Sequence, residues 1–483
     1  MTSAHSIPVQ SAQAEGSSRL GLVPLTALVV GSMIGGGVFS LPQNMAKGAS
    51  PGAVIIGWLI SGIGILALAL VYRGLSMRKP ELDAGPYSYA RAGFGDFIGF
   101  NSAWGYWLSA WLGNVSYAVL IFGALSYFVP VFGAEGNTWQ AIVAASILLW
   151  AIHALILMGV RQAAIINVLT TIAKLAPLFI FVVALILVFN LPSFNIDFWG
   201  AATPSLGSVM DQVKSTMLVT LWVFIGIEGA SVESGRAGRR SDIGTATILG
   251  FVVALGVYVL VSLLSFGVMS QGELAGLSTS ASMANVLEKA VGPWGSVLIR
   301  IGLVVSVAGA FLSWTLFAAE IPYRAAREGM MPDFFASENA KGSPAGALWI
   351  TNILVQIFLL ITLYANATYL ALYYISAVTI LVPYVLSGAY AVKLALTEGK
   401  QQAGLLVGLV ATIYGTWLVY AAGPNYLLMA ALLYAPGILF YWWARNARGE
   451  KAFTGVEGII ALALVAVAAI AAYLMWTGAI SPL

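Results

Sequence analysis

Cysteine is absent from this sequence, and histidine and charged residues are scarce. Without cysteine the chain cannot form disulfides, thiolate metal sites or a cysteine nucleophile. The two histidines are His5, in a polar N-terminal stretch, and His153, in an apolar segment with no second histidine nearby. We therefore expect His153 to be a paired interior residue, not a metal ligand. Charged residues make up 8% of the chain, compared with about 25% in water-soluble domains.

These absences argue against several classes of protein. A membrane enzyme is disfavoured because the sequence shows neither a cluster of histidines and carboxylates nor a serine–histidine arrangement. A channel is disfavoured because no filter-like sequence is repeated along the chain. We expect no bound metal, no cofactor and no nucleic-acid partner.

Apolar sequence, in contrast, is abundant. Hydrophobic residues make up 60% of the 483 residues, which indicates an integral membrane protein with most of its length in the bilayer. Thirteen apolar segments are long enough to span a membrane, which takes about 20 residues. They lie near residues 22–46, 52–76, 97–129, 139–158, 163–189, 212–232, 243–269, 295–319, 347–364, 367–392, 403–421, 425–443 and 457–477. Without the last of them, the count is twelve.

Lysine and arginine are distributed unequally over this topology. With the N-terminus inside, 17 of the 22 lie on the inner side, three on the outer side, and two, Lys174 and Arg300, within spans. Because positive residues gather on the cytoplasmic side, we expect a cytoplasmic N-terminus. Residues 1–19 lack the pattern of a secretory signal and are expected to form a disordered cytoplasmic tail. The inner loops at 78–96 and 319–346 are candidates for gating the inner mouth.

The segment Gly31–Pro42, within the first span, is the most informative part of the chain. It contains three consecutive glycines, Gly35, Gly36 and Gly37, each costing about 1 kcal/mol relative to alanine inside a helix. A broken helix is tolerated in a membrane only where it lines a cavity or is buried in protein. Its two ends offer N–H groups to a carboxylate and carbonyls to an ammonium, and an amino acid carries both. A glycine-rich packing face or a simple kink is the alternative interpretation.

A second interruption, at Leu221–Ser231 in the sixth span, favours a substrate site. The two interrupted spans are five segments apart, so the second copy is inverted in the bilayer. Interrupted helices at corresponding positions of two inverted halves are the best indication in sequence of a transporter's substrate site.

Four motifs resemble the amino acid–polyamine–organocation transporter superfamily. They are the glycine-rich break, Gly85–Ala90 after the second span, Phe224–Glu228 in the sixth, and Glu328–Pro332 after the eighth. The resemblance implies an all-α integral membrane protein with two inverted five-helix repeats and broken helices 1 and 6, the LeuT-like fold. A thirteenth span departs from the common twelve. The expected parts are the tail at 1–19, the first repeat at 20–190, the second repeat at 191–392 and peripheral C-terminal helices at 393–483.

Within the superfamily the sequence is most similar to the bacterial basic amino acid antiporters. This similarity implies a multi-pass protein of the bacterial cytoplasmic (inner) membrane, with the lipid bilayer around it. The implied activity is uptake of arginine in exchange for ornithine, electroneutral and by alternating access. A lysine/cadaverine-type exchanger and a proton-coupled basic amino acid permease are the alternatives, and a homo-oligomer is left open.

The resemblance also implies a set of substrate-binding residues. They are Ser32, Ile34, Gly35, Gly36 and Gly37 in the first span, Tyr106, Ser109, Ala110 and Asn114 in the third, Trp222, Ile225 and Glu228 in the sixth, Trp314 in the eighth, and Tyr374 and Ser376 in the tenth. Trp222 and Ile225 would offer carbonyls to the α-ammonium, and Trp314 would stack on the guanidinium. Where a relative offers a serine hydroxyl this sequence has Gly36, so carboxylate binding would depend on backbone N–H groups alone.

Two ionisable residues inside spans need an explanation, because such residues are costly in a membrane. Lys174, in the fifth span, resembles a lysine of sodium-independent relatives whose ammonium takes the place of sodium. It could instead tie two helices together, or carry protons. Glu228 lies at the second break, where a carboxylate could balance a cationic substrate, sense protons or bind free helix ends.

Overall fold

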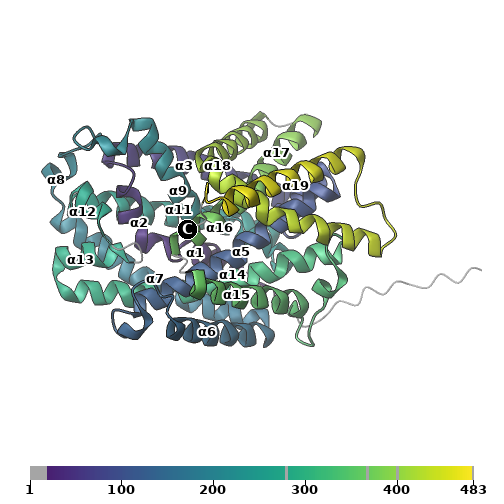
Figure 1. The fold of residues 1–483 in the computed structure, drawn as a ribbon, viewed down its shortest axis with the longest axis horizontal. Helices are drawn as coiled ribbons and strands as arrows, with labels where there is room; N and C mark the ends of the chain where they lie inside the picture. Colours follow the sequence, from purple (N-terminus) through teal and green to yellow (C-terminus); the bar gives the residue numbers. More distant parts are fainter. Residues whose placement is uncertain (1–18, 278–280, 366–368, 399–401, 481–483) are drawn as a thin grey trace, which may run out of the picture.

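The described part of the chain is all-helical. In the computed structural model it comprises residues 19–277, 281–365, 369–398 and 402–480, and within these residues the single β-type contact is an isolated bridge between Leu20 and Ala237 (Figure 1). The first half forms α1 (Leu22–Met33), α2 (Gly37–Ala46), α3 (Pro51–Arg78), α4 (Pro86–Phe94), α5 (Asp96–Leu125), α6 (Trp139–Leu157), α7 (Val160–Val188), α8 (Leu191–Asn195), α9 (Val209–Phe224) and α10 (Gly229–Val232). The second half forms α11 (Arg240–Phe266), α12 (Gln271–Ala275), α13 (Ser282–Val291), α14 (Pro293–Arg327), α15 (Ala345–Ala365), α16 (Tyr369–Thr379), α17 (Leu381–Glu398), α18 (Gln402–Ala447) and α19 (Gly455–Trp476). Short 3₁₀ turns lie at η1 (Pro130–Phe132), η2 (Pro204–Leu206), η3 (Ser234–Arg236) and η4 (Asp333–Ala336).

Local sequence explains where many of these helices begin. Ser208, Ser270 and Thr454 each cap a helix, and an acidic residue three positions later bonds back to the cap's backbone N–H. Proline at the start of α3, α4 and α14 fits the first turn, where an N–H would have no partner.

Eleven stretches of the described helices are long and apolar enough to cross a membrane. The α1–α2 stretch is one of them, whereas α9 is shorter, because the second break ends it at Phe224. α18 covers two of the predicted spans, 403–421 and 425–443, and its backbone departs from helix geometry at Gly423, with φ 78° and ψ 164°. These two differences separate eleven from thirteen, and the number of membrane crossings stays a prediction.

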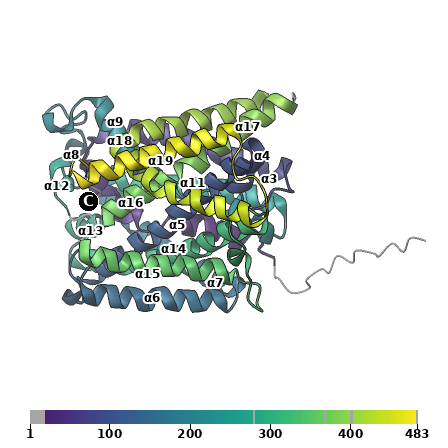
Figure 2. The ribbon, with the colours of Figure 1, turned by 45° about the vertical axis from the view of Figure 1, so that its right-hand side comes forward.

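The broken helices lie at the centre of the molecule. α1, α5 and α16 occupy the middle, with α6 and α15 along one side and α17, α18 and α19 along the other (Figures 1 and 2). Burial agrees with this order: 94% of the most apolar stretch of α5 is buried, compared with 17% for α19. The division into repeats at 20–190 and 191–392 stays a prediction.

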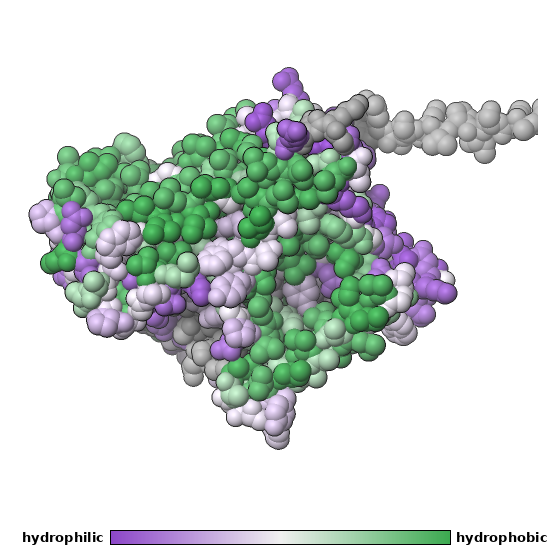
Figure 3. Space-filling view, turned by 90° about the horizontal axis from the view of Figure 1, so that it is seen from above, coloured by the Kyte–Doolittle hydropathy of each residue, from purple (hydrophilic) through white to green (hydrophobic). Residues whose placement is uncertain are grey.

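The surface matches that of a membrane protein. Hydrophobic residues cover most of the face in Figure 3, and hydrophilic residues gather mainly at its right-hand end. α4 lies at one end of the molecule and α8 and α12 at the other (Figure 2). We call the end that carries α4, Arg236 and Arg324 the basic end.

Candidate functional site

The break between α1 and α2 touches the break between α9 and α10. The Ser32 hydroxyl lies 3.2 Å from the carbonyl oxygen of Gly226 and 3.0 Å from that of Val29. Gly226 has φ 112°, and a Cβ added to it would lie 2.5 Å from Ser32 Oγ. Only glycine combines this backbone conformation with such a close approach. The two interrupted backbones therefore meet in the interior.

Lys174, on α7, binds the carbonyls that the first break leaves free. Its fully buried Nζ donates to the carbonyl oxygens of Gly31, at 2.8 Å, and Ile34, at 2.7 Å. The Ser306 hydroxyl, on α14, lies 3.0 Å from the carbonyl oxygen of Ile34 and 3.1 Å from that of Gly35. The end of α1 is thus held by donors from two other helices.

Lys174 belongs to a polar stripe on α7 that follows α1. Asn167 Nδ2 and Thr171 Oγ1 lie 3.1 and 3.2 Å from the carbonyl oxygen of Ala27. Ser313, on α14, donates to Asn167 Oδ1 at 2.7 Å. Residues 167, 171 and 174 share one helical face, so their spacing in an otherwise apolar segment was a signal that the sequence carried.

α2 begins with free backbone donors. In the described chain, the N–H groups of Gly36, Gly37 and Val38 have no acceptor within hydrogen-bonding distance, as expected of a first helical turn. They lie at the positive end of the helix dipole, which favours an anion. A Cβ on Gly36 would lie 2.2 Å from Leu120 Cδ2 of α5. A side chain at position 36 therefore has no room, and an anion here is held by backbone groups.

A small cavity lies between α5, α9, α14 and α16. It is lined by Ser109, Gly113, Tyr117, Trp222, Ile225, Trp314 and Ser376. Its volume is about 10 Å³, enough for about one water molecule. The protein is closed around this cavity, and a larger molecule requires the surrounding side chains to move.

Aromatic rings form two walls of the cavity. The Trp222 ring lies between Tyr117, at a centroid distance of 5.8 Å, and Tyr373, at 4.5 Å. The Trp314 ring lies 6.0 Å from Tyr106 and 5.5 Å from Phe317. Trp314 Nε1 also donates to the carbonyl of Ser32 at 3.2 Å, which ties this wall to the first break.

Glu228 lies at the second break but is not part of the cavity lining. Its side chain is fully buried, and one carboxylate oxygen accepts hydrogen bonds from Tyr384 Oη, at 2.5 Å, and from the N–H of Gly226, at 3.3 Å. Glu228 therefore joins the second break to α17.

The cavity brings together part of the predicted site. Its lining includes the predicted residues Ser109, Trp222, Ile225, Trp314 and Ser376. Ser109 and Ser376 are bonded to each other across α5 and α16, since Ser376 Oγ donates to the Ser109 carbonyl at 2.7 Å. The predicted Ser32, Ile34, Gly35, Gly36 and Gly37 form the neighbouring break. Tyr106 contributes the ring beside Trp314.

Three predicted residues lie outside the cavity lining. Asn114 Nδ2 donates to Thr315 Oγ1 at 3.0 Å, which joins α5 to α14. Ala110 is buried on α5. Tyr374 packs against Tyr426 of α18, and its neighbour Tyr373 is the residue that contacts Trp222.

Sequence reasoning missed Tyr117, Gly113 and Tyr384. Tyr117 follows Gly113 by four residues and Asn114 by three, so helical spacing from the predicted α5 residues could have found it. Tyr384 gave no comparable signal, because its partner Glu228 is 156 residues away.

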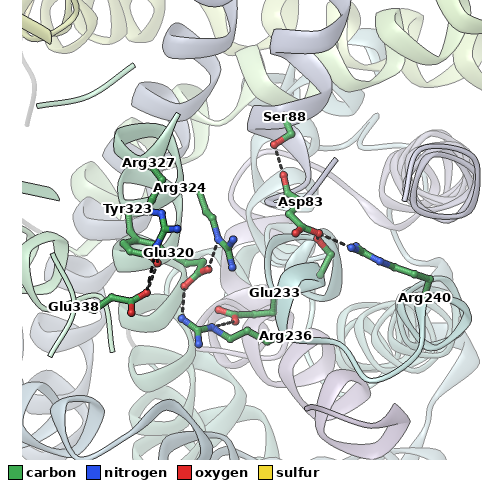
Figure 4. A network of polar contacts seen from close by, with 11 residues as sticks. Asp83, Ser88, Glu233, Arg236, Arg240, Glu320, Tyr323, Arg324, Arg327 and Glu338 are labelled. Atoms are coloured by element: carbon green, nitrogen blue, oxygen red, sulfur yellow. Dashed lines mark hydrogen bonds and ion pairs between the residues drawn. The ribbon is translucent and has the colours of Figure 1, made fainter. Parts of the chain in front are cut away.

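An ion-pair cluster closes the basic end (Figure 4). Arg236, of η3, contacts Glu233 at 3.3 Å and Glu320 of α14 at 2.9 Å, and Glu320 also binds Arg324 at 2.8 Å. Both glutamate side chains are almost fully buried, at 2% and 3% exposure. Burial, followed by repulsion from the Glu320 carboxylate, raises the pKa of Glu233 to about 7. Glu233 therefore depends on Arg236 to remain charged.

The two motif loops meet at this end as well. Tyr87 Oη donates to Glu328 at 3.0 Å, and Arg91 pairs with the same carboxylate. Asp96 joins Arg91, at 2.8 Å, to Arg445 of α18, at 3.1 Å. The loops after the second and eighth predicted spans are thus bonded to each other.

Comparisons with known proteins add to this geometry. A family model described as amino acid permease matches residues 20–451. The chain is 52% identical over 477 residues to a Pseudomonas aeruginosa protein named arginine/ornithine antiporter, covering 96% of this chain and 98% of the relative. It is 45% identical to a Chlamydia caviae protein named arginine/agmatine antiporter, covering 94% and 96%. A solved structure of a Na⁺-coupled sialic acid symporter, 12% identical with a TM-score of 0.54, covers 86% of this chain and 91% of its own, and confirms the predicted LeuT-like fold.

The contact between positions 36 and 120 can be tested directly. We expect Gly36→Ser to lower thermal stability by roughly 1–3 kcal/mol, because the new side chain overlaps Leu120. Leu120→Ala creates the space, so the double variant should be more stable than the sum of the two single losses. Unfolding of the purified protein in detergent measures all three, and strictly additive losses would show that the two side chains do not compete.

Proposed function

Because the chain belongs to the amino acid permease family, we propose that it is an antiporter that takes up arginine in exchange for ornithine by alternating access. The observation that carries the proposal is the 52% identity, over nearly the whole of both chains, to a protein named arginine/ornithine antiporter. Both amino acids carry one net positive charge, so the exchange is electroneutral and needs no ion gradient. Relatives named arginine/agmatine antiporter make agmatine the counter-substrate to compare, beside cadaverine and protons.

The substrate lies between the two breaks in this proposal. Its α-carboxylate accepts from the N–H groups of Gly36, Gly37 and Val38, at the start of α2. Its α-ammonium donates to the carbonyl of Ile225, which has no donor in the described chain. The Trp222 carbonyl is a weaker candidate because it already accepts from the N–H of Ile225 at 3.1 Å.

The cationic side chain extends along Trp314, and Glu228 balances its charge. Trp314 lines the cavity and is held by its bond to Ser32, so its ring is fixed in place. Lys174 already supplies one positive charge near the first break, which leaves the Glu228 carboxylate as the compensating group at the second. The remaining predicted residues, Tyr106, Ser109, Ala110, Asn114, Tyr374 and Ser376, support these walls.

The protein is placed in the bacterial inner membrane with its N-terminus and basic end in the cytoplasm. Opening toward the cytoplasm then requires separation of Arg236 from Glu320, since this ion pair links η3 to α14. The two repeats, at 20–190 and 191–392, would supply the parts that move.

The exchange can be tested in proteoliposomes loaded with radioactive arginine. Release should require arginine or ornithine outside, with one molecule entering for each that leaves, because neither conformational change proceeds with an empty site. Agmatine and cadaverine outside should release much less. Rapid release into substrate-free medium would contradict obligate exchange.

Trp314 is expected to act on the substrate's side chain. Trp314→Ala should weaken arginine binding about 5- to 30-fold, because a desolvated cation–π contact is worth about 1–2 kcal/mol. The planar guanidinium stacks better than a compact ammonium, so the loss for ornithine should be smaller and the variant's preference should shift toward ornithine. Trp314→Phe should lie between wild type and alanine.

Both dissociation constants, measured on purified protein, decide this prediction. Trp111→Ala is the matched control, since Trp111 is equally buried but packs against Phe358 outside the cavity. It should leave the arginine-to-ornithine ratio unchanged. Equal losses for both substrates in Trp314→Ala would exclude stacking.

Lys174 is expected to replace a coupling cation. Its ammonium binds the carbonyls of Gly31 and Ile34, so exchange should be the same when sodium is replaced by potassium at constant ionic strength. Lys174→Met should destabilise the protein, because two buried carbonyls lose a charged donor. A clear sodium requirement in the wild type would refute this role.

A further inference from the structure

Tyr117 is a polar residue of the cavity that the proposed function leaves without a role. It lies on α5, is 5% exposed and lines the cavity together with Trp222 and Trp314. Its hydroxyl points toward the first break: a Cβ on Gly35 would lie 2.8 Å from Tyr117 Oη. Tyr117 thus reaches from the cavity to the glycine segment.

The Tyr117 hydroxyl has no hydrogen-bond partner within the described ranges, 19–277, 281–365, 369–398 and 402–480. A buried hydroxyl without a partner costs free energy, unless something else binds it. Other buried tyrosines near the site are bonded: Tyr384 donates to Glu228 at 2.5 Å, and Tyr258 donates to the carbonyl of Val223 at 2.7 Å. Tyr117 is therefore available to a ligand.

The neighbouring start of α2 needs a further donor. A carboxylate has two oxygens and about four lone-pair positions, and the free N–H groups of Gly36, Gly37 and Val38 lie on one segment of backbone. Gly36 has no hydroxyl to add, and Leu120 fills the space that a side chain there would need. Tyr117 is one helical turn before Leu120 on α5, so its hydroxyl approaches the glycine segment from the same helix.

We propose that Tyr117 donates its hydroxyl to the substrate's α-carboxylate, and that this bond makes the site prefer amino acids to their decarboxylated amines. The assignment rests on the proposed exchange of amino acids. A site with a buried donor discriminates against a ligand that lacks the acceptor, because the donor is then left unpaired. Arginine and ornithine share the α-carboxylate, whereas agmatine and putrescine lack it.

This role differs from that of Trp314 in what it recognises. Trp314 meets the part of the substrate that differs between arginine and ornithine, and Tyr117 meets the part that they share. Loss of the Tyr117 hydroxyl should therefore weaken both amino acids equally. If Tyr117 served only to pack against Trp222, at 5.8 Å, a phenylalanine ring would replace it fully.

The experiment compares Tyr117→Phe with wild type in the purified full-length protein, using calorimetry with arginine, ornithine and agmatine. A hydrogen bond to a charged group predicts a loss of about 10- to 100-fold for arginine and for ornithine, with their ratio unchanged. Agmatine binding should change less than threefold. Tyr434→Phe is the matched control: it removes a buried hydroxyl that donates to the Thr379 carbonyl at 2.7 Å, away from the cavity, and should change none of the three affinities.

The outcomes separate the two proposals. Wild-type affinity for both amino acids in Tyr117→Phe, or equal losses for arginine and agmatine, overturns the role of Tyr117 and leaves the exchange intact. Wild-type protein that binds neither arginine nor ornithine overturns the proposed exchange, and this assignment with it. Arginine methyl ester, tested on the wild type, is a second measurement that needs no variant: it should bind weakly, since its ester lacks the carboxylate charge, and binding as tight as arginine would also overturn the role.

Discussion

The site depends on the need to satisfy backbone groups where the first helix is broken inside the membrane. A free carbonyl in such a place costs several kcal/mol. Lys174 and Ser306, from α7 and α14, bind the carbonyls of Ile34 and its neighbours, so the end of α1 is fixed to two other helices. No comparable donor or acceptor covers the start of α2 in the described chain, and its N–H groups remain available.

This asymmetry gives the interior its chemical direction. Carbonyls of the first break are used up in holding the structure, whereas the N–H groups beyond it and the carbonyl of Ile225 at the second break are free. The bond from Ser32 to Gly226 keeps the two breaks together. A zwitterion with its carboxylate at one break and its ammonium at the other fits these free groups, and the aromatic walls remain for its side chain.

The closed basic end is built so that it can separate. Glu233 and Arg236 belong to one segment, and Glu320 and Arg324 belong to another, so each segment carries its own ion pair. The bond between Arg236 and Glu320 joins the two. Breaking it leaves each segment neutral, which avoids the large cost of an unpaired buried charge. The same bundle can therefore be closed firmly and still open.

The sequence alone determined that the chain lies in a membrane and that two of its helices are broken, because composition and the cost of consecutive glycines act locally. It also indicated Trp222, Ile225 and Trp314, through resemblance at those positions. Only the tertiary structure decided the partners: Lys174 on the end of α1, Tyr384 on Glu228, Tyr373 in place of Tyr374 beside Trp222, and Tyr117 in the cavity. These depend on how far each helix is rotated about its axis and which neighbour it faces. Long-range packing sets both, and an almost uniformly apolar segment carries little record of either.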